Sequence, residues 1–282
     1  MTPEAHIADL ALLKSAALGA GRLAMRYFGK AHESWTKAGG SPVTEADIAL
    51  DAMLRQTLMT ARPGYGWLSE ETEDDPALRV QKRIFVVDPI DGTRGFMAGD
   101  RRWSISLAIV EDSRPVTAVL HAPALGLTYW AAAGHGAWRV DQSRDEKKQV
   151  DEKLAISSRT ALSGARIAGP RNWLRSRAFS ALSVRTADYV PSLALRFAMV
   201  ADGSLDAAFA RPDAHDWDLA ACDLLVHESG GALSDLGGNP PRYNRSGFCH
   251  DVLVAVNRAM HRSLVEAVVA AGEERRKART QN

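Results

Sequence analysis

Residues 84–96 read Ile-Phe-Val-Val-Asp-Pro-Ile-Asp-Gly-Thr-Arg-Gly-Phe, an apolar run followed by a segment with two aspartates, a proline and two glycines. Its β-branched and aromatic start predicts a short buried strand. Pro89 cannot donate a hydrogen bond within a sheet, so we expect the strand to end before it and residues 88–96 to form a loop. Gly92 permits a sharp turn that leaves the following amides free to face an anion. The stretch therefore predicts a buried strand leading into a loop that can hold both a cation and a phosphate.

Two helices are predicted before this stretch. Apolar residues at helical spacing favour a helix over residues 7–28. A second helix is expected to begin near Thr44, because Thr44 and Asp47 have the spacing of a capping box and leucines follow at positions 50, 54 and 58.

The residues after position 102 predict an antiparallel meander. Residues 103–110, 116–120 and 127–132 are alternately or continuously apolar and are separated by turns. Residues 115–138 contain no Asp, Glu, Lys or Arg and are long enough to span a bilayer, but prolines and glycines divide them into short pieces. We therefore expect buried strands here and no transmembrane segment.

A charge-rich segment at residues 141–153 predicts a solvated connection between two halves of the chain, and we place a domain boundary there. The second half has an α/β pattern. We expect strands at 166–168, 205–208 and 252–256 and helices at 193–200, 219–228 and 262–271.

The composition favours a globular protein with a small-molecule partner. The chain has 282 residues, of which 46% are apolar, enough for one or two packed domains. Its 35 basic and 34 acidic residues leave a net charge of +1, which gives no electrostatic footprint for a nucleic-acid polymer. Two cysteines outside any C-x-x-C pair and the absence of a secretory signal favour the cytoplasm.

The residues that carry chemistry are acidic and lie where loops leave regular elements. They are Glu70, Glu71, Asp88, Asp91 and Asp218. In one pocket these carboxylates would repel one another unless cations lay between them, and oxygen ligands without Cys or His favour Mg²⁺. Two such ions could activate a water and stabilise the leaving oxygen of a phosphate ester. Taken together, the acids predict phosphate-ester hydrolysis, whereas each one alone is more often a cap, a turn residue or a surface charge.

Three ordered motifs give the chain a family resemblance. Residues 88–96 are preceded by Ser69-Glu-Glu71 and followed by His215-Asp-Trp-Asp-Leu-Ala-Ala221 and Glu228-Ser-Gly-Gly231. This set resembles the magnesium-dependent, lithium-sensitive inositol monophosphatase superfamily over nearly the whole chain. The resemblance implies an α+β and α/β fold, a layered αβαβα sandwich. Its parts would be an α+β half with a large antiparallel sheet (1–153), an α/β half (154–272) and a flexible tail (273–282).

Within that superfamily the chain is most similar to the bacterial 3'(2'),5'-bisphosphate nucleotidases. The similarity rests on residues 37–49, on Leu68-Ser-Glu-Glu71 and on the strand end His121-Ala-Pro123. The implied reaction is removal of the 3'-phosphate from adenosine 3',5'-bisphosphate, a by-product of sulfate assimilation in sulfur metabolism. The alternatives are an inositol-1-phosphate or related sugar-phosphate monophosphatase and an inactive nucleotide-binding regulator.

The resemblance also implies residue roles. Two Mg²⁺ ions, with a weaker third, would be held by four side chains and one carbonyl oxygen: Glu70, Asp88, Asp91, Asp218 and the carbonyl of Ile90, with Asp88 bridging. Thr93 and Asp47 would form the water-activating pair, and Glu70 would help to place the third ion, so these three are the predicted catalytic residues. The substrate would contact the metal-site residues Glu70, Ile90, Asp91 and Asp218 and the amides of Gly92 and Thr93.

The implied partner is a small phosphorylated substrate, either a nucleotide or a sugar phosphate. Relatives are often homodimers, and the sequence leaves a homodimer open here, as it does a peripheral contact with the inner membrane. The expected substrate-binding segment departs from the family pattern around residues 166–173 and 192–196. Arg171 and Arg196 could bind a second phosphate there, although a lone arginine is more often a solvated or structural charge. Trp217 is predicted to be a packing residue and Cys222 a buried thiol.

Overall fold

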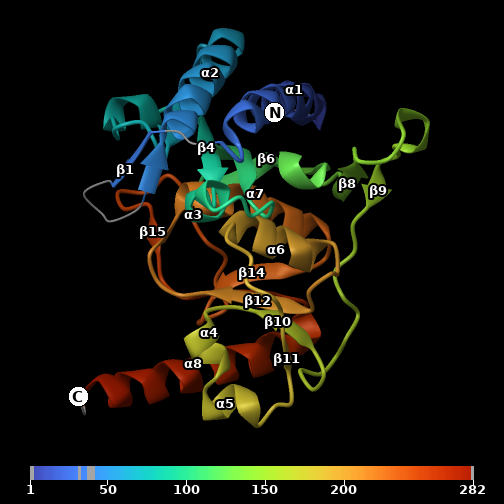
Figure 1. Ribbon diagram of the computed structural model, residues 1–282, viewed down its shortest axis with the longest axis vertical. Coiled ribbons are helices and arrows are strands. Elements are labelled where there is room, and N and C mark those ends of the chain that lie inside the picture. The colour runs from blue at the N-terminus through green and yellow to red at the C-terminus, as the bar shows by residue number, and fades with distance from the viewer. Residues whose placement is uncertain (1–2, 31–32, 37–41, 281–282) are drawn as a thin grey trace.

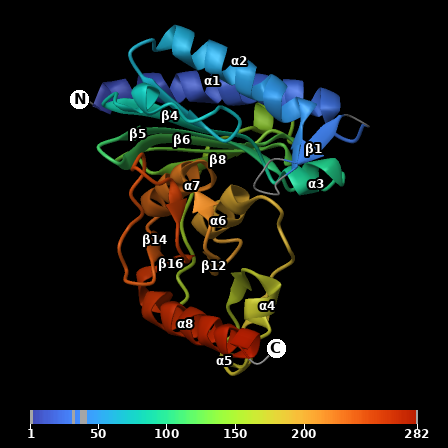
Figure 2. The same ribbon diagram turned by 90° about the vertical axis from the view of Figure 1, so that its left-hand side faces the viewer.

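The computed structural model describes residues 3–30, 33–36 and 42–280. Residues 37–41 of the motif at 37–49 and the last two residues of the predicted tail lie outside these ranges. The described chain forms five layers in the order helices, sheet, helices, sheet, helices (Figure 2). Its two termini lie toward opposite ends of the long axis (Figure 1). The predicted αβαβα sandwich is confirmed.

The first layer contains two long helices, α1 (Pro3–Tyr27) and α2 (Glu45–Ala61). The capping box predicted at Thr44 is present, because the Thr44 amide donates to the Asp47 carboxylate over 2.8 Å and the Asp47 amide donates back to the Thr44 hydroxyl. Apolar side chains of both helices form one core with one face of the large sheet. The short strands β1 (Ser34–Thr36) and β2 (Pro42–Thr44) pair just before α2.

The second layer is a seven-stranded sheet whose strands follow chain order. Its strands are β3 (Gly66–Ser69), β4 (Arg83–Asp91), β5 (Ser104–Glu111), β6 (Arg114–Ala122), β7 (Leu127–Ala132), β8 (Ala137–Asp141) and β9 (Glu152–Lys153). From β4 onward every neighbouring pair is antiparallel, which confirms the predicted meander, while β3 is parallel to β4. Short 3₁₀ turns interrupt the connections at Pro76–Arg79, Pro123–Leu125 and Glu146–Lys148.

The loop predicted for residues 88–96 is wrong. Strand β4 continues past Pro89 to Asp91, and the short helix α3 (Thr93–Met97) follows at once. The ladder with β5 is irregular between Asp88 and Asp91, so Pro89 falls where the regular hydrogen bonding is interrupted. A proline is tolerated inside a strand at such a bulge because no ladder hydrogen bond is required from it.

The third layer consists of α6 (Leu193–Ala201) and α7 (Asp216–Glu228), which lie between the two sheets (Figure 2). The fourth is a five-stranded mixed sheet in the order β11-β10-β12-β16-β14. Its strands are β10 (Arg166–Ala168), β11 (Arg185–Thr186), β12 (Ala207–Ala210), β14 (Ala232–Asp235) and β16 (Leu253–Val256). A separate antiparallel pair is formed by β13 (Ala214–His215), which leads directly into α7, and β15 (Cys249–His250).

The fifth layer covers the outer face of the smaller sheet with α4 (Arg171–Leu174), α5 (Arg177–Ser180) and α8 (Arg258–Thr280). Helix α8 continues through residues 273–280, which belong to the segment predicted to be a flexible tail. The apolar face of α8 extends only to Ala271, and the remaining turns are polar. Within the described residues, no helix has the length and apolar character needed to cross a membrane.

Candidate active site

The bulge in β4 places two aspartates on one face of the sheet. In a regular strand, residues three positions apart point to opposite faces. Here Asp88 pairs with Ser106 and Asp91 with Ser104, so Pro89 and Ile90 together oppose the single residue Ile105. The extra residue restores the alternation, and both carboxylates therefore emerge on the same side.

Asp88, Asp91 and Asp218 form a compact acidic group. One oxygen from each lies within 4.8 Å of the others. Asp218 comes from the first turn of α7, where its carboxylate accepts a hydrogen bond from the His215 amide over 2.7 Å. That carboxylate raises the pKa of the His215 imidazole. The group thus joins the end of a strand in the first half of the chain to the start of a helix in the second.

The start of α6 holds Asp91. The Asp91 carboxylate accepts hydrogen bonds from the Ser192 hydroxyl at 2.5 Å and from the amides of Leu193 and Ala194 at 3.1 and 2.7 Å. Backbone N–H groups at a helix start favour a negative charge. Ser192 also caps the helix by accepting from Leu195. This role of Ser192 was not predicted from the sequence, although a serine immediately before an apolar helix is a recognisable cap.

Two serines of β5 connect the acidic strand to both middle helices. Ser104, the partner of Asp91, lies 2.9 Å from the Ser192 hydroxyl at the start of α6. Ser106, the partner of Asp88, donates to the carbonyl of Trp217 in α7 over 3.1 Å. The starts of α6 and α7 are therefore fixed against neighbouring positions of one strand.

Burial and mutual repulsion make the acidic group suited to bind a cation. Burial raises the pKa of Asp88 well above its ordinary value, and the charges of Glu70, Asp91 and Asp218 raise it further. Burial also raises the pKa of Asp91 to about 7, with the charge of Asp218 acting in the same direction and the bonds from α6 opposing it. Within the described chain, Asp88 Oδ2 is buried without a hydrogen-bond partner. A divalent cation would satisfy that oxygen and relieve the repulsion, so these residues fit Mg²⁺.

Glu70 lies beside this group without being part of it. The end of β3 runs parallel to β4, with Ser69 opposite Val87, and the Glu70 amide donates to the Val87 carbonyl over 3.2 Å. Among the described acids, the three within 4.8 Å of one another do not include Glu70. Its charge still acts on Asp88, where it is the strongest electrostatic influence on the pKa.

Thr93 and Asp47 meet across the first two layers. The Thr93 hydroxyl lies 3.4 Å from Asp47 Oδ1 and 3.0 Å from the carbonyl oxygen of Ile90, so one proton has two acceptors within reach. The other Asp47 oxygen is taken by the Thr44 amide and hydroxyl, at 2.8 and 2.6 Å. The start of α2 therefore fixes Asp47 beside the turn that carries Thr93.

Gly92 makes this turn with a φ of +93°, in the left-handed region that favours glycine. A Cβ atom at this position would lie 2.9 Å from the Ser192 amide nitrogen. The turn therefore needs glycine both for its backbone conformation and for the close approach of the segment before α6.

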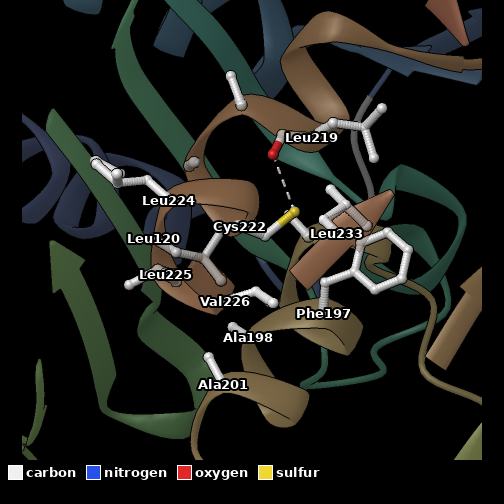
Figure 3. Close-up of a cluster of buried hydrophobic side chains, with 14 of the residues drawn as sticks. Leu120, Phe197, Ala198, Ala201, Leu219, Cys222, Leu224, Leu225, Val226 and Leu233 are labelled. Carbon is white, nitrogen blue, oxygen red and sulfur yellow. Dashed lines mark hydrogen bonds between the residues drawn. The ribbon is translucent and has the colours of Figure 1, made fainter. Parts of the chain in front are cut away.

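The helix that carries Asp218 is anchored by apolar contacts on both sides. Cys222, one turn after Asp218, is fully buried, and its thiol donates to the Leu219 carbonyl over 3.2 Å (Figure 3). Around it, Phe197 and Ala198 from α6 and Leu233 from β14 belong to the same core (Figure 3). Trp217 is also buried and stacks on the His215 ring at 4.7 Å. Cys222 and Trp217 thus occupy the packing positions predicted for them.

Comparison with known proteins agrees with this geometry. Residues 8–273 match the model of the inositol monophosphatase family. A histidinol-phosphatase of Mycobacterium tuberculosis is 37% identical over 230 residues, which cover 79% of this chain and 87% of that protein. The 3'(2'),5'-bisphosphate nucleotidase CysQ of Aggregatibacter actinomycetemcomitans is 31% identical over 216 residues, covering 74% and 77%. The crystal structure of the extragenic suppressor protein SuhB from Bartonella henselae superposes with a TM-score of 0.78 at 26% identity, covering 93% and 98%.

The chain belongs to the inositol monophosphatase family, and the predicted resemblance is confirmed. Members of this family are Mg²⁺-using phosphatases of small phosphorylated compounds, and the buried acidic group described above agrees with that chemistry.

Proposed function

We propose that this protein is a magnesium-dependent phosphomonoesterase that removes the 3'-phosphate of adenosine 3',5'-bisphosphate to give AMP and phosphate. Asp88, Asp91 and Asp218, together with Glu70 and the carbonyl of Ile90, would hold two Mg²⁺ ions and a weaker third. When bound, the ions would supply charge for activating a water and for stabilising the leaving oxygen.

The protein's own groups would position the reactants. Thr93 Oγ1 would accept a hydrogen bond from the attacking water while donating its own proton to Asp47 Oδ1, which lies 3.4 Å away. Asp47 is suited to this task because Thr44 holds its other oxygen and fixes the orientation of the carboxylate. The amides of Gly92 and Thr93 would bind the phosphate at the start of α3. This arrangement would promote the reaction by orienting the attacking water and the phosphate and by stabilising the charge that develops in the transition state.

The preference for a second phosphate rests on a pair of arginines that share the ring of Tyr189. The guanidinium groups of Arg171 and Arg196 each lie 5.9 Å from the centre of the exposed Tyr189 ring. Arg196 lies on α6 two residues after Ala194, whose amide donates to Asp91, and the Asp91 carboxylate opposes the lowering of the Arg196 pKa by burial. A substrate with a second phosphate offers these guanidinium groups an anion, whereas inositol 1-phosphate offers only hydroxyls there.

A comparison of substrates tests the proposal. Turnover of adenosine 3',5'-bisphosphate, inositol 1-phosphate and L-histidinol phosphate is measured with Mg²⁺ under identical conditions. We expect kcat/KM for the bisphosphate to exceed the others by about tenfold or more, or about 1.4 kcal/mol. A higher kcat/KM for either other substrate would contradict the nucleotidase assignment. Mg²⁺ binding with no turnover of any phosphate ester would support the inactive regulator instead.

Substitution of Arg171 tests the contribution of the arginine pair, and substitution of Arg262 provides the matched control. Arg171 is exposed, so Arg171→Gln should leave the fold unchanged. Losing one hydrogen bond to a charged group should lower kcat/KM for the bisphosphate by about tenfold or more and leave inositol 1-phosphate unaffected. Arg262→Gln, on the exposed side of α8, should change neither value. An equal loss of kcat/KM for both substrates in Arg171→Gln would show that the arginine pair does not favour a substrate with a second phosphate.

A further inference from the structure

Helix α2 carries a second buried carboxylate one turn after Asp47. Asp51 is 8% exposed, and both of its oxygens accept hydrogen bonds from hydroxyl groups. Ser69 donates to Oδ1 over 2.5 Å and Thr72 donates to Oδ2 over 2.8 Å. Within the described residues no Lys, Arg or His forms an ion pair with Asp51. Residues four apart lie on the same helix face, so Asp47 and Asp51 both point from α2 toward the large sheet.

The two hydroxyls bound to Asp51 are the ends of the turn that carries Glu70. Ser69 is the last residue of β3, and its hydroxyl also accepts from the Glu71 amide at 3.4 Å. Thr72 is held from the other side, because the Trp67 indole donates to its hydroxyl over 3.0 Å. Between them, the Glu70 amide is bonded to the Val87 carbonyl, next to Asp88. One carboxylate therefore closes a turn of four residues at both ends.

We infer that Asp51 is a positioning residue that fixes the Ser69–Thr72 turn and thereby aims Glu70 at the cation site. The inference rests on the proposed function, in which Glu70 is a metal ligand. Burying a carboxylate that is held only by hydroxyls costs free energy, because the charge loses its contact with water. An apolar residue would pack α2 on the sheet without that cost, so packing alone does not explain an aspartate at this position. Outer groups that orient metal ligands commonly change metal affinity by about 10–100-fold when removed. Helix α2 would then fix two parts of the site relative to each other, because Asp47 lies next to Thr93 and Asp51 binds both ends of the turn that carries Glu70.

Mg²⁺ binding to the full-length protein without substrate tests this inference. Isothermal titration calorimetry measures the Mg²⁺ dissociation constant of the wild type, Asp51→Ala and Asp51→Asn. In Asp51→Ala both hydroxyls lose their acceptor, and we expect the dissociation constant to rise by about tenfold or more. Asp51→Asn keeps one carbonyl oxygen and can donate to the other hydroxyl, so it should recover most of the affinity. The Mg²⁺ concentration for half-maximal turnover should rise in parallel, with kcat at saturating Mg²⁺ nearly unchanged.

A second buried aspartate provides the control. Asp9 of α1 is 1% exposed and binds Arg62, Tyr65 and Arg83. Arg83 is the first residue of β4, whereas Asp88 and Asp91 lie at the other end of that strand. Asp9→Asn should lower the melting temperature and leave Mg²⁺ affinity unchanged. If Asp51→Ala fails to fold, Thr72→Val takes its place, because it removes one of the two bonds to Asp51 with little change in shape.

The outcomes separate the two proposals. Wild-type affinity for Mg²⁺ in folded Asp51→Ala or Thr72→Val would overturn the role of Asp51 and leave the proposed phosphatase intact. A wild-type protein that binds no Mg²⁺ would overturn both. The result does not depend on which phosphate ester is the substrate, because no substrate is present in the calorimetry.

Discussion

Gly92 allows the backbone to turn from β4 into α3 directly beside the segment that starts α6. Its positive φ and its close approach to the Ser192 amide are separate constraints, and a comparison of the two glycines that flank α3 distinguishes them. Gly99 also has a positive φ, of +72°, but a Cβ atom there would meet nothing within 4 Å.

We expect Gly99→Ala to destabilise the fold by about 1–2 kcal/mol through backbone strain alone. Gly92→Ala should lose more stability than this and should also lose activity, since the added methyl group displaces Ser192, a donor to Asp91. Chemical denaturation and steady-state kinetics measure the two effects. Equal stability losses with full activity in both variants would show that the approach of Ser192 to Gly92 is unimportant.

His121 is a buried histidine outside the active site that should make stability depend on pH. It lies at the end of β6, 4% exposed, with Nδ1 2.9 Å from the Thr128 hydroxyl. Burial lowers the pKa of His121 from 6.5 to about 4. The folded protein therefore keeps the ring neutral over a pH range in which the unfolded chain takes up a proton.

The stability contributed by neutral His121 should be fully present above pH 6.5 and lost as the pH falls toward 4. The difference is about 3 kcal/mol at most. Urea unfolding of the wild type and His121→Gln between pH 4 and 7.5 measures it, because other titrating groups are common to both proteins. The wild-type curve should fall more steeply below pH 6.5; parallel curves would contradict the burial of a neutral ring.

The packing of α1 on the large sheet depends on one glycine. A Cβ atom at Gly21 would overlap the ring of His121, whereas one at Gly19, on the same helix, would make an ordinary contact with Met53 at 3.7 Å. Alanine is a better helix former than glycine by about 1 kcal/mol. The two positions should therefore respond to the same substitution with opposite signs.

Gly19→Ala should stabilise the protein by up to about 1 kcal/mol, and Gly21→Ala should destabilise it by about 1–3 kcal/mol because the helix must move away from the sheet. Thermal unfolding of the two variants gives the comparison. Stabilisation by both substitutions would mean that α1 does not lie as close to His121 as the structure has it.

Elements with local signals could be predicted from the sequence, and those that depend on distant partners could not. The start of α2 is encoded within Thr44–Asp47, and the meander within its own alternating residues. The predicted end of the strand before Pro89 was wrong, because a bulge that exists only in the pairing with β5 accommodates this proline. The strands β11 and β14 were missed because they are short and are defined by their neighbours in the smaller sheet.

The same distinction applies to the candidate site. The acids were found because the motifs around them are local. The link from Ser192 to Asp91 spans 101 residues, and the links from Asp51 to Ser69 and Thr72 span 18 and 21. Side chains this far apart meet only after the layers have assembled.

The whole molecule is held together by the middle layer, because one core includes residues of both sheets and of α6 and α7. Tyr129 in the large sheet also donates to Asp202 at the end of α6 over 3.0 Å, and Glu228 of α7 accepts from the amides of Gly134 and Gly136. The boundary near residue 153 therefore separates two halves of sequence that bury their apolar faces against each other.

Cutting the chain near this boundary should leave the two pieces together. We would insert a site for a specific protease between Lys148 and Gln149, next to the exposed side chains of Lys147 and Lys148, and cleave the folded protein. The cleaved protein should elute as one species in gel filtration and keep most of its activity, since the shared core is untouched. Separation of the fragments without denaturant would show that each half is an independent domain.

The bulge between Asp88 and Asp91 has a consequence for how this segment can change in evolution. Deleting Pro89 would leave Asp88 and Asp91 two positions apart, so a regular strand would still present both carboxylates on one face. A substitution of Pro89 that let β4 pair with β5 residue for residue would instead turn Asp91 toward the opposite face of the sheet, beneath α1 and α2. Asp91 would then leave Asp218 and the start of α6, although every residue of the chemistry was still encoded. Pro89 has no N–H to donate to a regular ladder and so helps to keep the bulge, and selection at this position should therefore act on the identity of the residue as well as on the number of residues.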